Sequence, residues 1–209
     1  MKSKVYVMKM NRKIEIVVNS IANGLKTILD ANLEGVYLHG SLVMGCFNPK
    51  TSDIDLIVIV KERIDDDCKR NIVEYLMTVE KEYPENDIEM SIVLEHFIQL
   101  GTHPMPFLLH YSKLHKENYL ENGKLCEESI DPDLISHLAV TRSRGKCIYG
   151  KAIDNLGICI KEVDFIDSVL NDLEYDENDI FDQPEYVILN CELSLVTNCC
   201  SHHHRNMHC

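Results

Sequence analysis

The sequence predicts an α+β fold, in which a mixed β-sheet with helices is followed by an all-α part. Apolar runs typical of strands, at residues 36–39, 54–60 and 88–94, alternate with segments whose apolar residues recur at helical spacing. Beyond the proline-rich stretch at residues 101–106, the pattern is helical only. We therefore expect a sheet domain at 1–103, a helical domain at 104–196 and a divergent tail at 197–209.

The first half is expected to contain two helices and three strands. An amphipathic helix is predicted where apolar residues from Ile14 to Leu29 form one buried stripe. The nearly continuous β-branched run from Ile54 to Val60 predicts a central strand covered on both faces. In the second half, helices are predicted around 134–145, 163–173 and 184–196.

Composition excludes several classes of protein. The chain has 209 residues, 45% of them hydrophobic, and a formal net charge of −13, which argues against a nucleic-acid partner. No apolar run approaches the roughly 20 residues that span a membrane. Nine cysteines without a paired framework are typical of reduced thiols, so we expect a cytoplasmic protein. The sequence leaves the oligomeric state open.

Two aspartates at the start of the central strand are the main candidate for chemistry. Side chains alternate along a strand, so Asp53 and Asp55 point to one face while Ile54 points into the core. Adjacent carboxylates repel each other unless a cation lies between them, and Mg²⁺ on nucleotide phosphates is the usual solution. Upstream, Gly40 allows a phosphate to approach the backbone, and the Ser41 hydroxyl is placed to bind it.

A third carboxylate is expected on the neighbouring strand. In the run from Ile88 to Leu94, alternation places Glu89 on the face opposite the apolar set, where it joins the two aspartates. Glu89 is expected either to complete a metal site or to take a proton from an attacking hydroxyl. The predicted reaction is transfer of a nucleotidyl group with release of pyrophosphate.

These motifs carry a resemblance. The stretch from His39-Gly40-Ser41 through Asp53-Ile54-Asp55 resembles the signature of the DNA polymerase β-like nucleotidyltransferases, and the closer similarity is to aminoglycoside adenylyltransferases of the streptomycin/spectinomycin type. The stretches 87–93, 133–145 and 186–190 support it.

The resemblance implies that AMP passes from ATP to a hydroxyl of an aminoglycoside, with antibiotic resistance as the result. It implies that Asp53 and Asp55 bind Mg²⁺, that Glu89 is the catalytic base, and that Ser41 and Ser52 contact phosphates. It also implies an active site between the sheet domain and the helical domain.

Each feature has a plainer interpretation. The aspartates are alternatively a solvated strand start, Glu89 a surface acid, and Ser41 a residue of the turn. His39 is expected to be a packed strand residue, and the cysteines and histidines after residue 198 are expected to be disordered or to bind metal adventitiously.

Two departures from the resemblance leave alternative functions open. The chain contains no tryptophan, although streptomycin-modifying relatives use one in the segment matching 110–116, and it leaves the family pattern after Asn190. The alternatives are an enzyme that modifies a protein or another small molecule, and a truncated, inactive homologue.

Overall fold

The computed structural model describes residues 11–83 and 85–173. The helices and strands, including two short 3-10 helices labelled η, are α1 (Arg12–Leu29), η1 (Asp30–Asn32), β1 (Leu33–Leu38), α2 (Gly40–Met44), β2 (Ile54–Val60), α3 (Asp66–Glu82), β3 (Ile88–Leu94), α4 (Glu95–Leu100), β4 (Met105–Phe107), β5 (Leu109–Tyr111), α5 (Lys113–Asn122), β6 (Ser129–Asp131), α6 (Leu134–Arg144), β7 (Lys146–Gly150), η2 (Ile153–Asn155) and α7 (Glu162–Leu173).

The central sheet has five strands in the order β5-β3-β2-β1-β7, and β4 pairs with β6 in a separate two-stranded sheet. Within the central sheet, β2 and β3 are parallel, while the other three pairings are antiparallel. The predicted α+β class and mixed sheet are therefore confirmed. The predicted helix at 184–196 and the tail at 197–209 lie outside the described residues.

Two strands of the central sheet come from the part of the chain that we expected to be all-α. β5 pairs with the edge of β3, and β7 pairs with β1. The expectation of a purely helical second part is corrected in these two segments and also in β4 and β6, because runs of three to five residues are too short to show a two-residue period. The sheet is thus built from both sides of the predicted boundary at residue 104.

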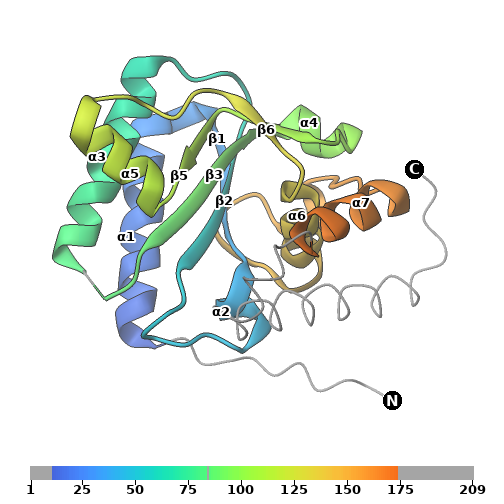
Figure 1. The fold of residues 1–209 in the computed structure, drawn as a ribbon, viewed down its shortest axis with the longest axis horizontal. Helices are drawn as coiled ribbons and strands as arrows, with labels where there is room; N and C mark the ends of the chain where they lie inside the picture. The colour runs from blue at the N-terminus through green and yellow to red at the C-terminus, as the bar shows by residue number, and fades with distance from the viewer. Residues whose placement is uncertain (1–10, 84, 174–209) are drawn as a thin grey trace.

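Helices cover both faces of the sheet, as Figure 1 shows with α1 and α3 on one side and α6 and α7 on the other. Alternation along β2 divides its side chains between two cores. Leu56 and Val58 pack in the core that includes α1 and α3, whereas Ile57 and Ile59 pack in the core that includes α6 and α7. The second core therefore joins the C-terminal helices directly to the sheet.

Each of the two long helices packed on the first face has a side-chain cap. Asn11 accepts a hydrogen bond from the backbone N–H of Lys13 at the start of α1, and Asp65 accepts one from Cys68 at the start of α3. Both helices bury a stripe of apolar residues against the sheet, as predicted for α1. No helix in the described ranges has the length and hydropathy of a membrane span.

Candidate active site

The sheet face that carries the second core is apolar at one end and polar at the other. Tyr37, Ile57 and Val93 pack there against the C-terminal helices. Toward the carboxyl end of β1 and the amino ends of β2 and β3, the same face carries Asp55 and Glu89. The polar end is where the predicted site residues gather.

The carboxylates of Asp55 and Glu89 come from residues directly opposite each other in the parallel β2–β3 pairing. The flanking residues Ile54 and Ile88 are also paired and lie in the first core, so the register places both acids on the opposite face. Asp53 lies just before β2 and is exposed to solvent. The prediction that alternating side chains place Asp55 and Glu89 on one face of the sheet is therefore confirmed.

Desolvation and like charge raise the pKa values of both aspartates, although Asp53 is the more exposed of the two. Desolvation raises the pKa of Asp55 to about 7, with further contributions from the neighbouring charges of Glu89 and Asp53. The pKa of Asp53 is raised by desolvation first and then by Glu89 and Asp87. Two ionised carboxylates in this position therefore need a cation to neutralise them at pH 7.

The turn between β1 and α2 lies directly against Asp55. Gly40 adopts φ +63°, and a Cβ built on it would lie 1.9 Å from Oδ2 of Asp55. The backbone N–H of Ser41 donates a hydrogen bond to the Asp55 carboxylate, and the N–H of His39 donates to its backbone carbonyl at 3.0 Å. Glycine is needed here for both its backbone conformation and the space.

Ser41 also has a hydroxyl group that is placed for a ligand. Its Oγ is buried and has no hydrogen-bond partner in the described structure. An unpaired buried hydroxyl costs free energy, and one of the few reasons to keep it is a missing partner such as a phosphate oxygen. Ser52, the other predicted phosphate contact, instead accepts a hydrogen bond from the N–H of Asn48 at 3.0 Å and so closes its own loop.

The donor set suits a hard cation bound together with a nucleotide. In residues 11–83 and 85–173, no three histidine, cysteine, aspartate or glutamate side chains are grouped so that they would hold a metal ion alone. The predicted set of Asp53, Asp55 and Glu89 therefore does not form a closed three-ligand cage. Mg²⁺ does not require one, because it usually binds one or two carboxylates and completes its shell with phosphate oxygens and water.

Three histidines lie near Asp55 and Glu89, and the sequence pattern did not mark two of them, His110 and His137, as residues of the site. The ring of His137, on α6, lies 5.1 Å from the ring of His39, and His137 is close enough to Asp55 to lower the pKa of that carboxyl. His39 is 7% exposed, so it is packed as expected, although it lies just after β1 at the N-cap of α2 and not in the strand; burial lowers its pKa. His110, on β5, contacts Ser91 and approaches Glu89.

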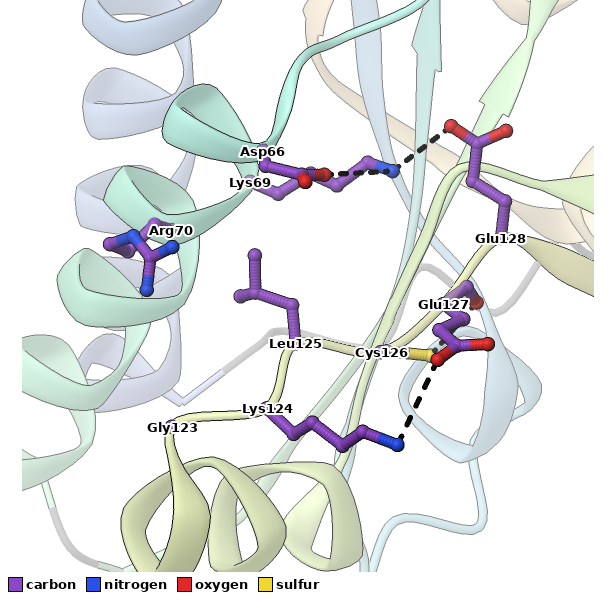
Figure 2. A pocket seen from close by; sticks show the side chains of 9 residues that line it. All are labelled: Asp66, Lys69, Arg70, Gly123, Lys124, Leu125, Cys126, Glu127 and Glu128. Atoms are coloured by element: carbon purple, nitrogen blue, oxygen red, sulfur yellow. Dashed lines mark hydrogen bonds and ion pairs between the residues drawn. The ribbon is translucent and has the colours of Figure 1, made fainter.

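A separate pocket of about 360 Å³ lies between the start of α3 and the segment 123–128 (Figure 2). Leu125 projects into the space beneath α3, and Lys69 reaches across to Glu128 at 2.9 Å. Arg63 also pairs with Glu128, which keeps the pKa of that carboxyl below its usual range. None of the residues that line this pocket is a predicted site residue.

The chain is similar in sequence to known nucleotidyltransferases. Residues 23–101 match the family "Polymerase beta, Nucleotidyltransferase". A spectinomycin 9-adenylyltransferase from Enterococcus faecalis is 27% identical over 137 residues, which is 64% of this chain and 53% of the relative. An aminoglycoside (3'') (9) adenylyltransferase from Klebsiella pneumoniae is 26% identical over 161 residues, covering 75% of this chain and 61% of the relative.

A solved structure shares the fold. The spectinomycin adenyltransferase AAD(9) from Enterococcus faecalis, solved with ATP and spectinomycin, superposes with a TM-score of 0.67 at 24% identity, covering 81% of this chain and 71% of the other. This chain spans about half to three fifths of the length of the curated relatives that it matches.

Proposed function

We propose that this chain, whose residues 23–101 belong to the polymerase β nucleotidyltransferase family and which resembles the aminoglycoside adenylyltransferases, transfers AMP from ATP to a hydroxyl group of an aminoglycoside. The observation that carries the proposal is the pairing of Asp55 with Glu89 beside the Gly40-Ser41 turn. Antibiotic resistance and a cytoplasmic location, where ATP is available, belong to the same proposal.

Asp53 and Asp55 are the residues that would hold Mg²⁺ together with the nucleotide phosphates. Two carboxylates at the start of one strand, whose pKa values are raised by desolvation and by neighbouring acids, supply the oxygen ligands that Mg²⁺ prefers. The ion, when bound, neutralises charge on the phosphates and favours departure of pyrophosphate. The Gly40-Ser41 turn would receive a phosphate through the close backbone and the unpaired Ser41 hydroxyl.

Glu89 would accept the proton of the acceptor hydroxyl. Its side chain is 40% exposed, so a bound acceptor can reach it, whereas burial desolvates the carboxyl of Asp55 beside it. As the acceptor oxygen bonds to the α-phosphorus, the bond from that phosphorus to the bridging oxygen breaks and pyrophosphate leaves. The hydroxyl proton passes to the Glu89 carboxylate.

Charge supports a cationic acceptor. The chain carries a formal net charge of −13, and three carboxylates belong to the site itself. A polycationic aminoglycoside is attracted to such a surface, and its ammonium groups offset the repulsion among the acids.

The proposal is tested by incubating the full chain with ATP, Mg²⁺ and a panel of aminoglycosides, including spectinomycin and streptomycin. We expect pyrophosphate release and a product heavier than one drug by one AMP group. Glu89→Gln should lower the rate by about 10²–10⁴-fold while ATP binding measured by calorimetry is retained. Tight ATP binding without pyrophosphate release for any drug would refute the proposed acceptor.

A further inference from the structure

His110 is held beside Glu89 by a buried hydroxyl group. Nδ1 of His110 lies 2.8 Å from Oγ of Ser91, and Nε2 of the same ring lies 3.9 Å from Oε1 of Glu89. The imidazole therefore stands between a short hydrogen bond on one side and a carboxylate on the other. Nothing in the proposed chemistry so far uses this ring.

The strand register explains why these three side chains meet. Ser91 follows Glu89 by two residues on β3, so both lie on the same face. His110 is paired directly with Ser91 across the β3–β5 ladder, and its neighbours Leu109 and Tyr111 face the opposite core. The imidazole must then lie on the face that carries Glu89.

The hydrogen bond to Ser91 selects a tautomer. Ser91 is only 5% exposed, and a buried hydroxyl normally uses its proton in a hydrogen bond. If the hydroxyl donates to Nδ1 of His110, the ring hydrogen is on Nε2, the atom that approaches Glu89. The other tautomer would present a lone pair to the carboxylate and repel it.

We propose that His110 is a positioning residue for Glu89, fixed by Ser91 so that its Nε2–H donates to the Glu89 carboxylate when substrates are bound. This inference rests on the proposed function of Glu89 as the base. The distance of 3.9 Å is longer than a hydrogen bond. Catalytic hydrogen bonds are often long without substrate and shorten in the complex, and the partly exposed Glu89 side chain has the freedom to move.

Neighbouring rings restrain the imidazole from other sides. The ring of His115 contacts that of His110 edge-on with centroids 5.0 Å apart, and Phe107 lies at 5.9 Å. Because packing already fixes this ring, no further conformational entropy is lost when it orients the carboxylate during the reaction. Glu89 would then present one defined oxygen to the acceptor.

Two isosteric substitutions separate positioning from packing. The amide of glutamine can place its N–H₂ near the position of Nε2, whereas the shorter asparagine can reach only the position of Nδ1. We expect His110→Gln to keep kcat within about fivefold of the wild type, and His110→Asn and Ser91→Ala to lose about 10–100-fold, the range typical of groups that orient a functional side chain. KM for ATP should change by less than about twofold in all three.

A matched control is available on the same chain. His96 is exposed on α4, where its ring contacts Phe97. His96→Asn should leave kcat and KM unchanged. Thermal unfolding of every variant confirms that the chains compared are folded.

The tautomer is measured independently of activity. In long-range ¹H–¹⁵N spectra of the wild type, the Nδ1 signal of His110 should have the shift of an unprotonated ring nitrogen, and Ser91→Ala should mix the two tautomers. If no acceptor supports pyrophosphate release, the proposed function fails, and this spectrum still decides whether Nε2 carries the hydrogen. A protonated Nδ1, equal kcat values for His110→Gln and His110→Asn, or a parallel loss of ATP affinity would each overturn the inference.

Discussion

Replacing Asp55 by asparagine measures how much the repulsion among Asp53, Asp55 and Glu89 lowers the stability of the folded chain when no cation is bound. The amide has nearly the shape of the carboxylate and retains an oxygen to accept the N–H of Ser41, but it carries no charge. The substitution therefore removes repulsion with Glu89 and Asp53 while the packing against Gly40 is kept.

The expected magnitude follows from the pKa of Asp55. Burial and the neighbouring acids raise that pKa from 3.8 to about 7. At a pH above both the unfolded and the folded pKa, this difference lowers the free energy of unfolding by roughly 4 kcal/mol. Because the folded state holds the proton more tightly than the unfolded state, stability falls as pH rises between about 4 and 7. The Asp55 side chain keeps partial contact with solvent, which screens the charge, so we expect about 1–3 kcal/mol.

The assay is urea unfolding of the wild type and Asp55→Asn at pH 5 and pH 8 in EDTA. The variant should be the more stable protein at pH 8, with a smaller difference at pH 5. Titrations shared by both proteins cancel in this difference. Adding Mg²⁺ and ATP should stabilise the wild type at pH 8 and stabilise the variant less. Asp154→Asn, at an exposed position in η2, is the control and should change stability by less than about 0.5 kcal/mol at either pH.

A variant less stable than the wild type at pH 8 without metal would refute this reasoning. So would a stability difference that is equal at the two pH values, because a pH-independent effect reports altered packing rather than the charge of Asp55.

Three further substitutions test the turn and the support behind the site. Gly40→Ala should cost more than about 2 kcal/mol, since a methyl group would collide with Asp55 at a positive φ; a midpoint of thermal unfolding equal to that of the wild type would contradict the close approach of Gly40 to Asp55. Ser41→Ala should raise the stability of the free chain by up to about 1–3 kcal/mol, because it removes a buried hydroxyl that has no partner, and should weaken ATP binding in calorimetry by about 3–10-fold; unchanged affinity would remove the hydroxyl from the phosphate site. Tyr111→Phe removes the hydroxyl that donates to the buried Glu80 at 2.8 Å, but Lys116 still donates to the same oxygen at 2.9 Å, so urea unfolding should show a loss of about 0.5–1.5 kcal/mol, and no loss would mean that Lys116 alone satisfies that oxygen.

The sequence predicted those parts of the fold that repeat a pattern over several residues. The helical spacing from Ile14 to Leu29 and the apolar run from Ile54 to Val60 correspond to α1 and β2 within two residues. β5 was not predicted, and residues 147–150 of β7 were expected only as a short extended piece and not as a strand of the sheet, because three to five residues give too few positions to show alternation. Their pairing with β3 and β1 depends on contacts between distant parts of the chain, which local patterns do not encode.

The same distinction applies to the candidate site. Asp55 and Glu89 were predicted to share a face because each lies on a strand with clear alternation, and the observed register pairs them. His110 and His137 were missed because an isolated histidine carries no spacing signal, and both reach the acids only through β5 and α6. Ser41 was predicted from its place after a glycine, but its lack of a partner is visible only in the folded chain.

The position of β7 beside β1 affects how the protein is made. Synthesis at about 5–20 residues per second leaves on the order of ten seconds between the emergence of β1 and that of its partner. During that interval one edge of β1 is unpaired, and the apolar side chains of Tyr37 and Ile57 lack the helix that later covers them. The ribosome-bound chain therefore presents a transient target for chaperones, and slower translation before residue 146 should lengthen its exposure to aggregation.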